Sequence, residues 1–134
     1  MVAQPVQTAL QRAAAALEQG RTSEATTVLG ACLKRGGLNR DDEWRVRGAL
    51  ADAWLQRGEV GEAATALGRQ PDATAEQTPD AVLALLWRLH GRIAFARGEQ
   101  SRAIALLSRA LKHAELAHDS RAIGLTHYEL ARCY

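Results

Sequence analysis

Residues 57–67 read RGEVGEAATAL, and residues 97–107 read RGEQSRAIALL. Each stretch has a glycine in second place, an alanine five positions later and a leucine four positions after that alanine. One constant offset relates Ala51 to Gly91, Trp54 to Ala94, Gly58 to Gly98, Ala63 to Ala103 and Leu67 to Leu107. Self-similarity at a period of this length predicts a stack of similar structural units.

Two further copies of the pattern lie on either side of these stretches. At twice the same offset, Leu130, Ala131 and Tyr134 correspond to Leu50, Ala51 and Trp54. Closer to the N-terminus, at an offset shorter by two positions, the matching residues are Ala13, Gly20, Ala25 and Leu29. The repeat therefore extends over most of the 134 residues.

Composition and turn residues indicate that each unit is a pair of helices. The chain is rich in Ala, Leu, Arg, Glu and Gln, which lose little freedom in a helix, and only 4% of it is aromatic. The predicted helices cover residues 4–19, 22–35, 41–57, 60–69, 79–97, 100–117 and 119–134. The predicted N-terminal signals are Thr22 or Ser23, Asp41, and Thr78 followed by Pro79. We expect one all-α domain over residues 1–134, with repeats at about 4–35, 41–69 and 79–117 and a partial repeat at 119–134.

The repeated residues have packing roles in this arrangement. Gly20, Gly58 and Gly98 fall where one helix ends and the chain reverses, a place that favours positive φ. Small residues at Ala51 and Gly91 allow the partner helix to approach closely. On the second helices, the small residues Ala25, Ala63 and Ala103 share a face with Leu29, Leu67 and Leu107.

These residues resemble the tetratricopeptide repeat. The matches are Leu50, Ala51, Trp54, Gly58, Ala63 and Leu67 in the second pair, Trp87, Gly91, Gly98, Ala103, Leu107 and Ala110 in the third, and His127, Leu130, Ala131 and Tyr134 at the start of a fourth. The third pair departs from the pattern at His90 and Ala94, and the period is longer than is usual for that repeat. The long repeat of this chain is similar to repeats in the sensor regions of bacterial transcription activators and signalling proteins. The resemblance implies a right-handed superhelical solenoid of about 3.5 repeats, built from seven helices, that binds proteins or peptides.

Charge and motifs argue against several other functions. The 17 basic and 15 acidic residues are interspersed, which does not favour direct binding of nucleic acid. There is no membrane-length apolar run and no secretory signal pattern, so we expect a cytoplasmic protein with reduced Cys32 and Cys133. No phosphate-binding loop, nucleophile elbow or paired-histidine metal motif occurs, so we expect no enzyme activity, metal or cofactor. His90 is interpreted as a satisfied core histidine.

In a stack of this kind the first helices of successive pairs line a concave groove. Helical phase predicts the groove-facing residues Arg45, Asp52, Leu55, Leu85, Arg88, Arg92, Phe95, Tyr128 and Arg132. Three arginines near two aromatic rings suit an acidic peptide, through bidentate hydrogen bonds and stacking. The alternative is a solvated helix face on which these arginines pair with acidic residues such as Glu129.

The chain finishes inside an amphipathic pattern, ELARCY, so Ile123, Leu130 and Tyr134 are expected to form a partly exposed face. Two explanations stay open: the chain belongs to a longer repeat protein, or the face pairs with a second copy in a symmetric homodimer. The expected function is a non-enzymatic protein or peptide interaction module of a bacterial regulatory protein. The alternatives are a small-ligand-sensing domain and a structural oligomerisation scaffold.

Overall fold

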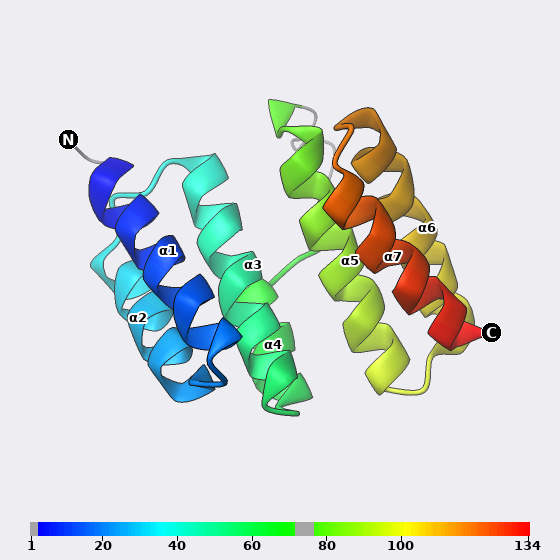
Figure 1. Ribbon diagram of the computed structural model, residues 1–134, viewed down its shortest axis with the longest axis horizontal. Coiled ribbons are helices and arrows are strands. Elements are labelled where there is room, and N and C mark those ends of the chain that lie inside the picture. Colours follow the sequence, from blue (N-terminus) through cyan, green and yellow to red (C-terminus); the bar gives the residue numbers. More distant parts are fainter. Residues whose placement is uncertain (1–2, 72–76) are drawn as a thin grey trace. The chain divides into compact units, whose positions relative to one another are not determined.

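The computed structural model describes residues 3–71 and 77–134, which form seven helices and no strand (Figure 1). The helices are α1 (Ala3–Glu18), α2 (Thr22–Arg35), α3 (Arg40–Gln56), α4 (Val60–Leu67), α5 (Asp80–Ala96), α6 (Gln100–Leu116) and α7 (Ser120–Cys133). Each begins and ends close to its predicted bounds. The all-α prediction is therefore confirmed.

The helices belong to two compact units, Met1–Gly68 with α1 to α4 and Arg69–Tyr134 with α5 to α7. The single domain expected over residues 1–134, and a continuous superhelix through it, stay predictions. None of the helices in the described residues combines the length and the apolar character that crossing a bilayer would require.

The first unit consists of two helical hairpins, α1 with α2 and α3 with α4, and α3 also packs against α1 and α2. Its core is built largely from alanine and medium-sized apolar residues, among them Ala13, Ala25, Leu29, Val46 and Ala53. Small side chains at these positions let the helices approach closely, so the core needs few large residues to reach native packing density.

The second unit contains the hairpin of α5 and α6, with α7 packed against both. Its core joins Leu83, Trp87, Ala94, Ala103, Leu106, Leu107, Ala110 and Cys133. Gly91 is a point of close approach between α5 and α6, because a Cβ atom built there would lie 2.7 Å from Leu107 Cγ. The predicted role of this glycine is confirmed.

The repeat register is also confirmed by burial and backbone geometry. Ala25, Ala63 and Ala103 are fully buried, as are the leucines four positions after them. Gly20, Gly58 and Gly98 end the first helix of their hairpins with φ of 74°, 78° and 78°. An L-residue with a side chain rarely adopts such angles, so glycine is needed at these reversals.

The predicted helix caps were less accurate. Helix α2 begins at Thr22, and its N-cap position is occupied by Arg21, whose side chain makes no capping hydrogen bond. Neither Thr22 nor Ser23 is the N-cap residue. The α3 cap is Asn39, whose Oδ1 accepts from the Asp42 amide at 2.8 Å, while Asp41 lies within the first turn.

The other helix ends also differ in detail from the prediction. Pro79, not Thr78, occupies the α5 cap position, and Thr78 is buried outside the helix. Helix α4 ends at Leu67 and not at residue 69, because Gly68 turns to φ 75°. Cap identity depends on the residue at which helical dihedral angles begin or end, and several neighbouring polar residues compete for that place.

Candidate functional site

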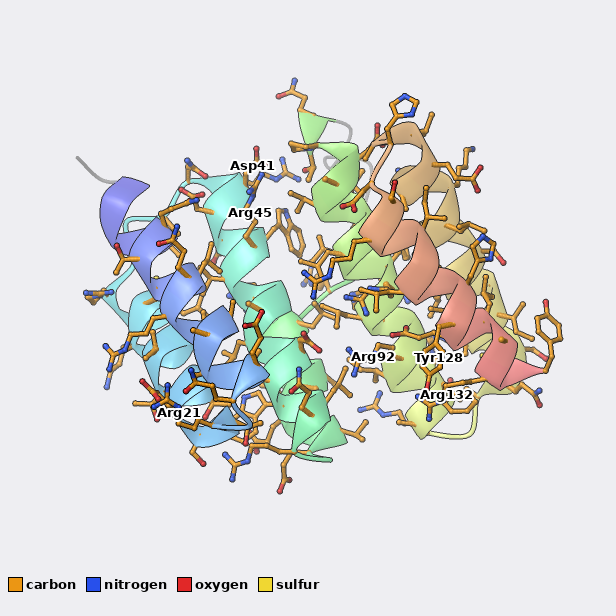
Figure 2. All side chains as sticks on the ribbon, in the orientation of Figure 1. Arg21, Asp41, Arg45, Arg92, Tyr128 and Arg132 are labelled. Carbon is orange, nitrogen blue, oxygen red and sulfur yellow. The ribbon has the colours of Figure 1, made fainter. Side chains whose placement is uncertain are left out.

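A cluster of arginine and aromatic side chains lies along the two adjacent helices α5 and α7. Helix α5 contributes Arg88, Arg92 and Phe95, which share one face because they follow one another at spacings of four and three. Helix α7 contributes Tyr128, Glu129 and Arg132. Figure 2 labels Arg92, Tyr128 and Arg132, and shows them grouped where these helices run side by side. We call these six residues the arginine–aromatic surface.

Glu129 is the acidic centre of this surface. Its Oε1 atom lies 3.0 Å from Nη1 of Arg88 and 3.5 Å from Nε of Arg92. The side chains of Glu129 and Arg88 are only 11% exposed, whereas that of Arg92 is 24% exposed. The alternative of acidic pairing, raised from the sequence, therefore holds for Arg88 and Arg92. Arg88 acts structurally, as a buried link between α5 and α7.

Arg132 has a different environment. Its guanidinium carbon lies 5.2 Å from the centre of the Phe95 ring and 6.0 Å from that of Tyr128. Such contacts orient a guanidinium and leave its N–H edges available for hydrogen bonds. The interactions found for Arg132 within residues 3–71 and 77–134 are these two ring contacts, and no carboxylate there pairs with it. Arg132 is exposed, and Tyr128 is 64% exposed.

The remaining predicted groove residues are not part of this surface. Arg45, Asp52 and Leu55 lie on α3 in the first unit, where Arg45 is exposed and the other two are half-buried. Leu85 lies on α5 and is half-buried. The structure thus brings together Arg88, Arg92 and Phe95 of α5 with Tyr128 and Arg132 of α7, but not Leu85.

The residues predicted as a self-association face differ in exposure. Tyr134 is 87% exposed and Ile123 is half-buried, as expected for residues near an open face. Leu130 is half-buried like Ile123, and it packs against the core of the second unit. The self-association face stays a prediction.

Two polar features of the second unit were missed or misjudged from sequence. His113 Nδ1 lies 2.8 Å from Asp80 Oδ1, which ties the end of α6 to the start of α5. The antiparallel hairpin itself was a sufficient signal for this pair. His90 was expected to be satisfied, yet its Nε2 is buried without a partner among the described residues. Burial lowers the pKa of His90, more than its hydrogen bond with the Arg69 backbone raises it, with a small further lowering from Arg102.

The accessible side chains of the arginine–aromatic surface have the chemistry of an anion-binding site. No histidine, cysteine, aspartate or glutamate group of three or more gathers as a metal site within the described residues. The accessible features are the Arg132 guanidinium, the exposed ring of Tyr128, the half-buried ring of Phe95 and the partly exposed Arg92. These groups are able to hold a carboxylate or another anion beside an apolar contact. Comparison of the chain with models of protein families, with curated protein sequences and with solved structures finds no match.

Proposed function

We propose that this protein is a non-enzymatic interaction module that binds a protein segment carrying an acidic side chain next to an apolar one. The carrying observation is Arg132, which two aromatic rings orient and which no carboxylate of the described residues neutralises. The acidic group would bind the Arg132 guanidinium, and the apolar side chain would contact the exposed ring of Tyr128.

The charges of the surface support an acidic partner. Arg88, Arg92, Arg132 and Glu129 together carry three positive charges and one negative charge, a sum of +2. Arg88 and Arg92 both contact Glu129, so the accessible positive charge belongs mainly to Arg132. An exposed guanidinium–carboxylate pair contributes about 0.2–1 kcal/mol, so the apolar contact with Tyr128 must supply part of the affinity.

The tetratricopeptide-like architecture forms part of the same proposal. Its support is the hairpin pattern: a glycine turn with positive φ, a buried alanine, and a buried leucine four positions later, seen at Gly58 and again at Gly98. In such a stack α5 and α7 are the first helices of successive repeats, and their shared side faces the groove. A role in a bacterial regulatory or signalling protein in the cytoplasm belongs to the proposal too.

The alternative of a small-ligand sensor would need a closed pocket near Phe95 and Tyr128. Tyr128 is 64% exposed, so its ring does not wall off such a pocket. This exposure favours the interaction module, for which an accessible ring is an advantage.

The test is fluorescence anisotropy of the full chain with two short labelled peptides of equal length. One contains glutamate and leucine residues among alanines, and the other has lysine in place of each glutamate. We expect the acidic peptide to bind more tightly, and Arg132→Ala or Tyr128→Ala to weaken it roughly tenfold, a loss of about 1.4 kcal/mol. Arg109→Ala is the matched control, because Arg109 is also an exposed arginine stacked on a ring, that of Trp87, but on α6.

Equal binding of the two peptides would contradict the proposal. So would a loss of affinity in Arg109→Ala as large as that in Arg132→Ala. A steep fall in affinity with added salt is expected, since the contact is between exposed charges.

A further inference from the structure

Helix α7 continues the arginine–aromatic surface toward the N-terminus of that helix. Tyr128 and Arg132 belong to the surface (Figure 2), and Arg121 and Leu125 precede them on α7. These four residues follow one another at spacings of four, three and four, so they share one side of the helix. All four are exposed, Leu125 by 37% and Tyr128 by 64%. We call Arg121, Leu125, Tyr128 and Arg132 the α7 face.

The two arginines of the α7 face are available to a partner. Arg121 and Arg132 form no ion pair within the residues that the structure describes. Glu129, the acidic residue of α7, is engaged by arginines of α5, and Asp80, the acidic residue of α5, lies 2.8 Å from a histidine of α6. The α7 face therefore has a positive charge at each end and two apolar side chains between them.

The separation of these charges fits a helix. Arg121 and Arg132 lie eleven positions apart, which is three turns of an α-helix to within about 20°, and about 16 Å along its axis. A helix lying along α7 has the same rise per residue, so two acidic residues eleven positions apart would match both arginines. An extended segment presents side chains on one face at even spacings, of which four residues span about 13 Å and six about 20 Å. A helical partner is therefore the better match.

A second copy of the chain is a poor occupant of the α7 face. The face contains no acidic residue, so two copies packed through it would bring four arginines together. Like charges disfavour this pairing, whereas acidic side chains complement it.

We propose that the α7 face binds an amphipathic helix of another protein, with two acidic residues eleven positions apart and two apolar residues between them. The acidic residues pair with Arg121 and Arg132, and the apolar ones contact Leu125 and Tyr128. The spacing of four, three and four reads the same in both directions, so the bound helix can run parallel or antiparallel to α7. This inference rests on the proposed function, to which it adds Arg121, Leu125 and the helical form of the partner.

The probe is a labelled, terminally blocked peptide of alanine and glutamine that contains glutamate, leucine, leucine and glutamate at spacings of four, three and four. In the control peptide the second glutamate is moved two positions closer to the first. The two peptides have the same composition and charge, but a spacing of nine places the glutamates on opposite sides of a helix. Binding to the full chain is followed by anisotropy, and circular dichroism at 222 nm compares the helix content of the two peptides.

We expect the probe to bind roughly threefold more tightly than the control peptide, because an exposed guanidinium–carboxylate pair contributes a factor of about this size. Arg121→Ala should abolish the difference by weakening the probe alone. Arg109→Ala removes the same charge from an exposed position on α6 and should leave the difference unchanged. Leu125→Gln should weaken both peptides, because it removes an apolar contact and no charge.

The outcomes separate this inference from the proposed function. If the two peptides bound equally and Arg132→Ala weakened both, the proposed function would stand and the helix with two acidic residues would be wrong. If Arg132→Ala weakened neither peptide, both would be wrong.

Two further results would overturn the inference by assigning another occupant. A third peptide, with proline between the two leucines, cannot form a continuous helix, and binding as tight as that of the probe would indicate an extended segment. A concentration-dependent dimer in sedimentation velocity that Leu125→Gln abolishes would make a second copy the occupant.

Discussion

Replacing Gly91 by alanine tests the close approach of helix α5 to Leu107 of helix α6. A Cβ atom at this position would lie 2.7 Å from Cγ, 2.8 Å from Cδ2 and 3.3 Å from the backbone nitrogen of Leu107. Leu107 is 1% exposed, so its side chain has little room to turn away. Helix α5 and helix α6 must therefore separate slightly, or Leu107 must leave its preferred rotamer.

The expected cost follows from two opposing effects. Overpacking of a tight core costs about 1–3 kcal/mol. An alanine in place of a helical glycine contributes roughly 1 kcal/mol in the other direction. We expect Gly91→Ala to lower the free energy of unfolding by about 1 kcal/mol, which lowers Tm by roughly 4 °C in a chain of this size.

Gly124→Ala supplies the matched control for this experiment. Gly124 also lies inside a helix, α7, but a Cβ atom there meets nothing within 4 Å. We therefore expect stabilisation of roughly 0.5–1 kcal/mol, of opposite sign to Gly91→Ala. Urea unfolding followed at 222 nm measures both. If Gly91→Ala stabilised the protein as much as Gly124→Ala does, the close contact with Leu107 would be wrong.

Three further predictions concern stability. Arg88→Ala should lower the free energy of unfolding by about 3 kcal/mol, because it removes the closest partner of the buried Glu129 carboxylate. Arg102→Ala removes only an exposed ion pair and should change that free energy by under about 0.5 kcal/mol. Losses of similar size in urea unfolding would contradict the burial argument. His90→Leu should stabilise the protein increasingly, relative to the unchanged chain, as pH falls below 6.5. Burial lowers the pKa of His90 in the folded protein, so below 6.5 the unfolded chain takes up a proton that the folded protein does not, and the stability of the unchanged chain falls. A difference in unfolding free energy that is the same at pH 7.5 and pH 5.5 would refute this. Asn39→Ala should cost about 1 kcal/mol through loss of the α3 cap, measured by thermal unfolding, and an unchanged Tm would show that the cap does not contribute.

The sequence alone was enough to predict the helices and their register. Gly58 and Gly98 recur at the hairpin turns, and Ala63 and Ala103 recur at the packing face, with the same spacing to the following leucine. These features depend on local geometry, namely the α-helical repeat and a glycine at positive φ. They also involve helices that are neighbours in sequence, so the repeat period of the sequence is enough to predict them.

The tertiary structure was needed to decide which polar groups are used inside the protein. Arg88 and Arg92 of α5 both contact one carboxylate, Glu129, which belongs to α7 and is separated from them in the chain by the whole of α6. Arg132 stacks on Phe95 instead. Sequence placed the three arginines on one surface, but the rotation of α7 against α5 decides which arginine is buried and which stays accessible.

The same rotation leaves Leu130 half-buried against the core of the second unit and Ala131 exposed. A rotation of this kind is set by side-chain packing between helices, and no period in the sequence records it.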